Sequence, residues 1–209
     1  MKKVIAFDLD GTLIDSLGIG LEGFVFSSKK LKLNLKKDEL AKIYSLTEPV
    51  LLRKHFPKIK EKTIKEFQKT ARKHFFKNVE RIKSFPSVEK TLTELKKRYK
   101  IIIISNTNYK LILEALESAK LNPLFFDIIV GEDLVKNAKP SPDELNIAKK
   151  ILNHKVDYFV GDSPVDLKAG KRAKVKTIGI TTGYSSKKDL QEQKPFAIID
   201  KMGELLEIL

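Results

Sequence analysis

The 209-residue sequence contains no cysteine and only three histidines, His55, His74 and His154. Without cysteine, the chain cannot form disulfides, zinc–thiolate sites or a cysteine nucleophile. The three histidines do not have the spacing of metal ligands, and we interpret them as surface or helix-face residues. Thiol-based chemistry and zinc–thiolate sites are therefore excluded.

Long apolar runs are also missing. No uncharged apolar stretch approaches the roughly 18 residues that a membrane-spanning helix requires. The apolar segment at the start of the sequence is too short for a secretory signal, and Asp8 interrupts it. We therefore expect a cytoplasmic protein with no membrane partner. Its 42% of hydrophobic residues suffice for a folded core.

Acidic residues are in the minority, with 27 against 41 lysines and arginines, and the net charge is +14. Residues 16–80 alone carry 14 lysines and 2 arginines against 7 acids, an excess of +9. We interpret this segment first as a solvated, lysine-rich surface, and the alternative is a positive field that attracts anionic substrates. It has no interleaved aromatic or arginine platform, so nucleic acid is not an expected partner.

Six short apolar runs predict strands, because they are rich in β-branched or aromatic residues and mostly continuous, as in strands buried on both faces. They cover residues 4–7, 101–104, 125–130, 158–160, 177–180 and 196–199. Between the later runs, apolar residues recur at helical spacing, for example Val88, Leu92, Leu95 and Tyr99. Alternating strands and helices predict an α/β fold with a Rossmann-like, doubly wound parallel sheet.

One segment breaks this alternation. It is residues 16–80, where Ile64, Phe67, Ala71 and Phe75 form a helical stripe and no clear strand appears. We therefore expect a small α-helical cap domain inserted after the first strand. The core domain would consist of residues 1–15 and 81–209, and the cap of residues 16–80.

Polar residues follow the ends of the predicted strands, where parallel α/β sheets bind ligands. They are Asp8 and Asp10 after the first run, Ser105 and Asn106 after the second, Lys139 after the third, and Asp162 and Asp166 after the fourth. Asp8 and Asp10 are two residues apart and leave an extended chain on the same side. Together with Asp162 they offer oxygen ligands for Mg²⁺. Lys139 would offset the remaining charge, Ser105 or Asn106 would bind an anion, and an aspartate beside them could act as a nucleophile in phosphoryl transfer.

These motifs resemble those of the haloacid dehalogenase superfamily. The four matching elements are Asp8-x-Asp10-Gly11-Thr12, Ser105-Asn106, Lys139-Pro140 and Gly161-Asp162-x-x-x-Asp166, in this order. The stretches "VGEDLVKNAKPSPDEL" and "YFVGDSPVDL", together with Asp15-Ser16, resemble the phosphoglycolate phosphatase-like branch. Two positions differ from the family's pattern: Ser87 follows Pro86 where glycine is usual, and Lys174 stands where glycine often ends a helix.

The resemblance implies an enzyme, a magnesium-dependent phosphatase that acts on a small anionic phosphate monoester. Asp8 would attack phosphorus and form an aspartyl-phosphate, and Asp10 would act as acid and base. Lys139 would pair with Asp8 and the phosphate, while Thr12, Ser105 and Asn106 would hold the phosphoryl group. The metal ligands would be Asp8, Asp10, Asp162 and Asp166, and the helical cap would close over the site.

Other functions fit parts of the sequence. A β-phosphoglucomutase-type phosphomutase shares all four motifs, and a pyrophosphatase or nucleotidase stays open. A binding protein could use the basic cap to hold RNA. A response-regulator receiver domain is excluded, because its phosphorylated aspartate follows the third strand and its chain is much shorter.

Helix capping is a structural alternative for two of the motifs. Asp166 could mainly cap a helix that begins after Ser163, and Ser105 and Asn106 could simply start a helix. The sequence Ser141-Pro142-Asp143-Glu144 predicts a capping box with proline at the first helical position.

Overall fold

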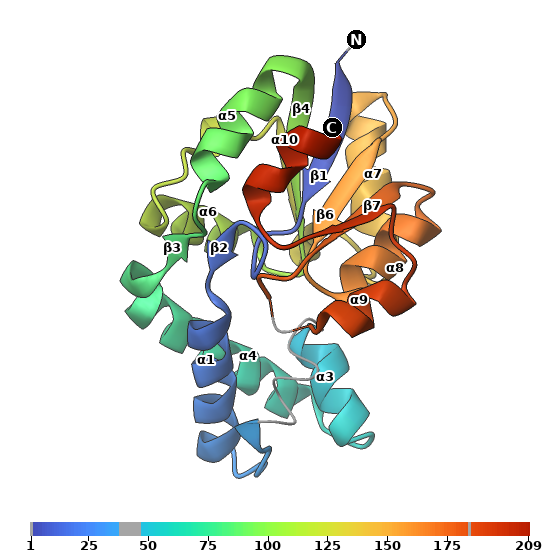
Figure 1. Cartoon of the computed structure of the whole chain (residues 1–209). Coiled ribbons are helices and arrows are strands. Elements are labelled where there is room, and N and C mark those ends of the chain that lie inside the picture. Colours follow the sequence, from blue (N-terminus) through green and yellow to red (C-terminus); the bar gives the residue numbers. More distant parts are fainter. Residues whose placement is uncertain (1, 38–46, 184) are drawn as a thin grey trace.

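The computed structural model describes residues 2–37, 47–183 and 185–209. Its centre is a six-stranded parallel sheet in the order β5-β4-β1-β6-β7-β8, with helices on both faces (Figure 1). The strands are β1 (Lys3–Phe7), β4 (Tyr99–Ser105), β5 (Ile128–Gly131), β6 (Tyr158–Gly161), β7 (Lys176–Ile180) and β8 (Ala197–Ile199). The predicted α/β fold with a parallel, doubly wound sheet is confirmed.

Alternate residues of the central strands enter two hydrophobic clusters on opposite faces of the sheet. Ile5 and Phe7 of β1 pack in a cluster with α5 (Val88–Arg98), α6 (Tyr109–Ser118) and α10 (Leu205–Ile208). Val4 and Ala6 pack on the other face with α7 (Asp143–Leu152) and α8 (Pro164–Arg172). Because both faces are buried, the strands are apolar along their length, which made them readable from the sequence.

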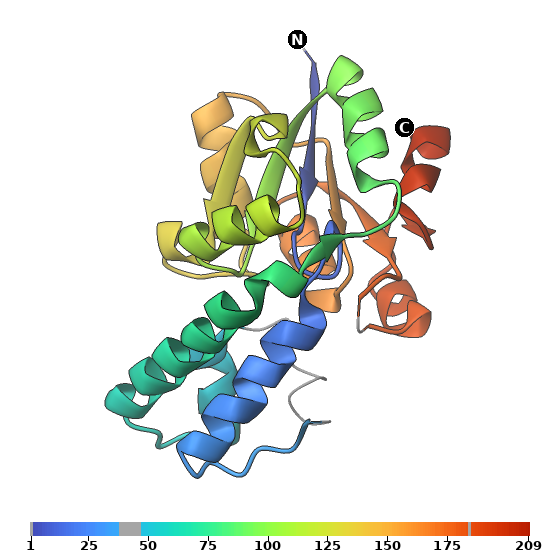
Figure 2. The ribbon, with the colours of Figure 1, turned by 90° about the vertical axis from the view of Figure 1, so that its left-hand side faces the viewer.

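Among the described residues, three helices form a separate unit below the carboxyl ends of the strands in the view of Figure 1. They are α1 (Leu17–Lys30), α3 (Glu48–His55) and α4 (Glu61–Asn78), and α1 and α4 lie side by side (Figure 2). This helical unit has its own hydrophobic cluster, which includes Phe24, Leu52 and Phe67. Residues 38–46, which belong to the predicted cap, lie outside the described residues.

The chain enters and leaves the helical unit through two adjacent segments. β2 (Ile14–Asp15) pairs antiparallel with β3 (Lys83–Ser84), and the short helix η1 (Val79–Arg81) precedes β3. The other short elements are η2 (Pro123–Phe125), η3 (Glu132–Leu134), α9 (Lys187–Glu192) and η4 (Met202–Glu204). The two-residue strands were not predicted, because so short a pair carries no hydrophobic period.

Two local predictions are wrong. The predicted strand 125–130 begins only at Ile128, since Asn122 caps η2 and Phe125 closes that turn. The predicted capping box at Ser141 does not form: α7 begins at Asp143, and the Ser141 hydroxyl donates instead to the Asp143 carboxylate. Glu144 does not reach back to the backbone of Ser141 and is fully buried.

Both departures from the family's glycine pattern fall at left-handed backbone positions. Ser87 has φ 64° just before α5, and Lys174 has φ 57° just after α8. Only glycine adopts this region without a steric penalty. The structure therefore explains why glycine is usual at these two places.

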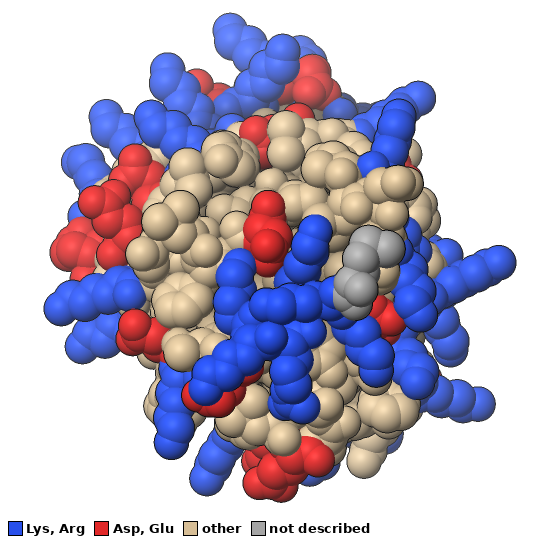
Figure 3. Space-filling view, turned by 90° about the horizontal axis from the view of Figure 1, so that it is seen from above, with Lys and Arg blue, Asp and Glu red and all other residues tan. Residues whose placement is uncertain are grey.

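Positive charge also covers the core. Figure 3 looks onto the end of the molecule away from the helical unit, and lysines and arginines surround and cross that face. Positive charge is thus also found on this face of the core, outside the segment 16–80. Among the described residues, no helix has both the length and the apolar character needed to cross a membrane.

Candidate active site

The carboxyl ends of β1, β4 and β6 open onto a cavity of about 700 Å³ between the core and the helical unit. Asp8, Asp10, Ser105, Asn106, Lys139, Asp162 and Asp166 all line it. The opposite wall includes Phe24 of α1 and Ala71, Arg72 and Phe75 of α4. Seven of the eight predicted site residues thus face one space, and the eighth, Thr12, is buried beneath it.

A tight loop after β1 positions Asp8 and Asp10. The carbonyl oxygen of Leu9 accepts hydrogen bonds from the N–H groups of Thr12, Leu13 and Ile14, which turns the chain back sharply. Gly11 has φ 81°, and a Cβ there would lie 2.8 Å from the Asp162 carboxylate. The glycine is therefore required both for the turn and for the close approach of β1 to the end of β6.

Lys139 lies at the centre of the buried charges. Its Nζ is 2.6 Å from Oδ1 of Asp8, 2.6 Å from Oδ1 of Asp166 and 3.1 Å from the carbonyl oxygen of Ile104. The three ammonium protons are thus all donated, and Lys139 is only 5% exposed. Burial opposes its charge, but Asp166 and Asp8 outweigh burial and hold the pKa of Lys139 well above its usual value.

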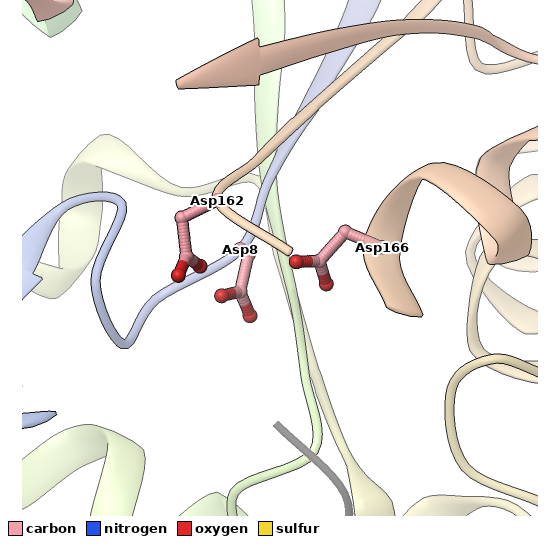
Figure 4. Close-up of side chains that lie close together, drawn as sticks. All are labelled: Asp8, Asp162 and Asp166. Atoms are coloured by element: carbon pink, nitrogen blue, oxygen red, sulfur yellow. The ribbon is translucent and has the colours of Figure 1, made fainter. Parts of the chain in front are cut away.

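The carboxylates around Lys139 are too many for one cation. Asp8, Asp162 and Asp166 each offer an oxygen within 4.8 Å of the others, and all three are buried. Figure 4 shows their carboxylates pointing toward a common centre from the ends of β1 and β6 and the start of α8. Burial raises the pKa of Asp8 to about 7, against the opposing effect of Lys139, and Asp166 and Asp10 raise it further. Burial, Asp166 and Asp8 also raise the pKa of Asp162 well above its usual value.

A hard divalent cation fits this donor set. Three carboxylates against one ammonium leave an excess of two negative charges in a buried place, and buried charges without compensation are costly. Carboxylate oxygens are the ligands that Mg²⁺ prefers. Gly183 keeps the space beside Asp162 open, because a Cβ there would lie 1.7 Å from Oδ2 of Asp162.

The side chain of Asp10 is held apart from these three carboxylates. Its Oδ2 accepts a hydrogen bond of 2.6 Å from Oγ1 of Thr107, and its Oδ1 accepts one from Oγ of Ser16. Thr12 donates to Oδ1 of Asp162 at 3.4 Å, so it orients a carboxylate. Of the four predicted metal ligands, the structure therefore groups the side chains of Asp8, Asp162 and Asp166.

Asp166 serves two purposes in the fold. Its Oδ2 accepts hydrogen bonds from the backbone N–H and the hydroxyl of Ser163, which completes a capping box at the start of α8. Its Oδ1 pairs with Lys139. The predicted helix cap is confirmed, and the same residue is part of the buried charge cluster.

Ser105 and Asn106 form another part of the same wall, at the end of β4. The Ser105 oxygen accepts from the N–H of Thr107 at 3.1 Å, and Nδ2 of Asn106 donates to the carbonyl oxygen of Lys139 at 3.1 Å. The predicted helix after them begins only at Tyr109 and is capped by Asn108. The cap of this helix is therefore Asn108, and the alternative that Ser105 or Asn106 starts the helix is wrong.

Sequence reasoning did not select Arg72, Glu132, Ser16 or Thr107 as site residues. Arg72 and Glu132 line the cavity and are paired at 3.0 Å across it, from α4 and from the turn after β5. Arg72 was detectable only as one of two arginines in a lysine-rich segment. Ser16 belongs to the quoted pair Asp15-Ser16, and Thr107 directly follows the motif Ser105-Asn106, so the sequence offered a signal for both.

Comparisons with known proteins agree with this arrangement. The family model of the haloacid dehalogenase-like hydrolases matches residues 5–180. A phosphoglycolate phosphatase of Aquifex aeolicus is 34% identical, over 99% of this chain and 96% of its own length. The pyrophosphatase PpaX of Bacillus cereus (strain B4264) is 31% identical, with the same two coverages. Among solved structures, a hydrolase from Pseudomonas syringae has the same fold, with a TM-score of 0.91 at 21% identity, over 99% of this chain and 97% of that one.

Proposed function

Because the chain belongs to the haloacid dehalogenase-like hydrolases and is a phosphatase of their phosphoglycolate phosphatase-like branch, we propose that it hydrolyses a small phosphate monoester in a magnesium-dependent reaction. The observation that carries the proposal is the cluster of Asp8, Lys139, Asp162 and Asp166 at the bottom of one cavity. Such a set combines a nucleophile, a cation and metal ligands at one point.

Asp8 would be the nucleophile. Lys139 contacts Oδ1 of Asp8, so we assign the attack on phosphorus to Oδ2. The new P–O bond forms as the bond to the leaving oxygen breaks, and Asp10 gives that oxygen a proton. Water then attacks the aspartyl-phosphate, Asp10 takes its proton, and Asp8 and inorganic phosphate are released.

Other residues would bind the phosphoryl group, compensate its charge and orient Asp10 during these steps. Ser105 and Asn106 would bind the phosphoryl oxygens, and Lys139 would offset their charge. Ser16 and Thr107 would keep the Asp10 carboxylate in place. Mg²⁺ would be held by the Asp8 and Asp162 carboxylates and the Asp10 backbone carbonyl, with Asp166 as ligand or orienting group, and would supply positive charge for the phosphoryl group.

The domain division belongs to the same proposal. Residues 1–15 and 81–209 would act as the catalytic core, and residues 16–80 as the cap that excludes bulk water and selects the substrate. The adjacent strands β2 and β3, where the chain leaves and re-enters the core, support a hinge at this boundary. The cytoplasmic location stays a prediction from the sequence.

Pyrophosphate is a second candidate substrate, favoured by the 31% identity to a pyrophosphatase. It contains the same phosphoryl group, with a second phosphate as the leaving group. The residues assigned above would act on it without change of role.

A panel of phosphate monoesters, sugar phosphates and pyrophosphate tests the proposal, with Mg²⁺ and with EDTA. We expect hydrolysis with Mg²⁺ only. Asp8→Asn should lower kcat by at least about a thousandfold, because it removes the nucleophile and keeps its shape. Circular dichroism and thermal melting of the variant provide the folding control. Comparable turnover by wild type and Asp8→Asn would overturn the assignment.

A further inference from the structure

The cap wall of the cavity carries a positive group that the proposed chemistry does not use. Four cationic residues line the cavity among the described parts of the chain: Lys54, Arg72, Lys139 and Lys168. Lys139 is fully engaged by the core, and Lys54 and Lys168 are exposed. Arg72 alone among these combines a cap position with partial burial, its side chain being 34% exposed.

Arg72 is only partly satisfied by its neighbours. One nitrogen, Nη2, donates to Oε1 of Glu132 at 3.0 Å. Its Nε is buried and has no hydrogen-bond partner among the residues that the structure describes. A buried donor without a partner is unfavourable, because it has lost its hydrogen bonds to water. Nε and one Nη together form the fork that binds a carboxylate or phosphate through two parallel hydrogen bonds.

Glu132 is a weak competitor for that fork. It comes from the core, at the start of η3, and only 14% of its side chain is exposed. Burial and then the nearby Glu48 raise the pKa of Glu132 to about 7, with Arg72 opposing. Near pH 7 the Glu132 carboxyl group is therefore protonated part of the time, and an anion bound at Arg72 would favour its protonation further. Arg72 can therefore exchange this partner at low cost.

We propose that Arg72 is the residue that selects the substrate, by binding a second anionic group carried on the leaving group of the phosphate ester or anhydride. The substrate class is then a small molecule with a phosphoryl group at one end and a carboxylate or second phosphate at the other. This inference rests on the proposed function, in which the core binds the transferring phosphoryl group. Leu17, Phe24 and Phe75 add apolar surface to the cavity lining. Of the two described cap cations in that lining, Lys54 is exposed to solvent and Arg72 is partly buried, so Arg72 is the better placed partner for the second charge.

Two matched substrates test the inference. 2-Phosphoglycolate and 2-hydroxyethyl phosphate share a two-carbon chain, and a carboxylate in one is replaced by a neutral alcohol in the other. In the wild type, kcat/KM should favour 2-phosphoglycolate. Arg72→Gln should lower the ratio of the two kcat/KM values by about 10- to 100-fold, mainly through KM, as expected for the loss of a charge-assisted bidentate contact. For pyrophosphate, which also carries a second anionic group, Arg72→Gln should lower kcat/KM as much as it does for 2-phosphoglycolate.

Two further variants distinguish a specific contact of the Arg72 guanidinium from a general effect of positive charge on the cap. Arg72→Lys keeps the charge without the fork and should restore part of the ratio. Lys73→Gln removes the same charge from the next residue of α4, which is exposed and outside the cavity lining, and should leave the ratio at the wild-type value. Thermal melting of each variant monitors the fold.

The outcomes distinguish this inference from the proposed function. If Arg72→Gln slows both substrates equally, Arg72 merely ties the cap to Glu132, and the inference is wrong while the phosphatase stands. Equal kcat/KM for the two substrates in the wild type would lead to the same conclusion. If the wild type with Mg²⁺ hydrolyses neither of them, nor pyrophosphate, nor p-nitrophenyl phosphate, the proposed function fails and the inference fails with it.

Discussion

The two walls of the cavity differ in the kind of residues that form them and in how those residues contact one another. The core wall consists of carboxylates and one lysine that are bonded to one another and buried, as in the contacts of Lys139 with Asp8 and Asp166. The cap wall combines apolar residues such as Phe24 and Phe75 with a few polar ones. Within the part of the chain that the structure describes, its arginine, Arg72, has Glu132 as its one ion-pair partner, at 3.0 Å. A mutually bonded charge cluster leaves little freedom for change, whereas one arginine can be replaced or re-paired. This difference supports our proposal that the core wall carries out the reaction and the cap wall selects the substrate.

The largest expected effect on stability is the loss of Lys139. Lys139→Met keeps the volume but leaves Asp8 and Asp166 buried without their cation. In EDTA at pH 8, the free energy of unfolding should fall by about 3–5 kcal/mol, the usual cost of removing one partner of a buried ion pair. Urea denaturation measures it.

The control for this prediction is Lys62→Met, which removes an exposed lysine of the cap helix α4. It should leave the free energy of unfolding nearly unchanged. Equal losses of unfolding free energy in the two variants would mean that the buried lysine of the core contributes no more to stability than an exposed lysine of the cap. The contrast between the two walls would then be wrong.

A second prediction concerns Glu144, which the proposed mechanism does not use. It is fully buried, and neither carboxylate oxygen has a hydrogen-bond partner among the described residues. Burial raises the pKa of Glu144 to about 8, with Lys139 opposing and Asp8 and Asp166 contributing to the rise. Between pH 4.5 and 8 the folded protein therefore keeps a proton that the unfolded chain releases, so stability falls as pH rises through this window.

Glu144→Gln removes this titration and keeps the shape of the side chain. At pH 5 the variant and the wild type should be similar. At pH 8 the variant should be more stable by about 1–3 kcal/mol, the cost of one uncompensated buried polar group. Urea denaturation from pH 5 to 8 with saturating Mg²⁺ tests this, and Glu89→Gln on the exposed face of α5 is the control. Parallel pH curves for wild type and Glu144→Gln would contradict it.

Much of the core wall was predictable from the sequence, because its residues follow strands. Apolar runs mark strands buried on both faces, and Asp8, Ser105 and Asp162 stand at their ends by position alone. The loop at Asp10-Gly11 and the cap formed by Ser163 and Asp166 depend on near neighbours. Short-range rules therefore fix the placement of these groups, and a parallel sheet brings them together.

The remaining features depend on contacts that no local pattern encodes. Arg72 reaches the cavity only because α4 docks across the core at Glu132. Glu144 follows the same Ser-Pro pattern that forms a capping box at Ser163, yet its side chain is buried and its helix starts one residue later than expected. Propensity at a helix start is worth about 1 kcal/mol, so tertiary packing easily overrides it.

The smallest predicted effect concerns two of the lysines with left-handed backbone angles, Lys32 in the cap and Lys174 in the core. Lys32 has φ 55° after α1 in the cap, and Lys174 has φ 57° after α8 in the core. Changing either lysine to glycine removes the steric penalty, although the greater entropy of the unfolded chain offsets part of this gain. Each variant should therefore be more stable by about 0.5–1 kcal/mol. If cap and core unfold as one unit, both variants raise the global free energy of unfolding equally. Most buried apolar residues of the cap form a cluster of their own, and only Ile19 and Phe75 among the described, buried cap residues belong to the core cluster. We therefore expect that Lys174→Gly raises global stability, whereas Lys32→Gly mainly slows amide hydrogen exchange within α1 and α4. Equal global gains in urea denaturation would show that the two walls, despite their different construction, open only together.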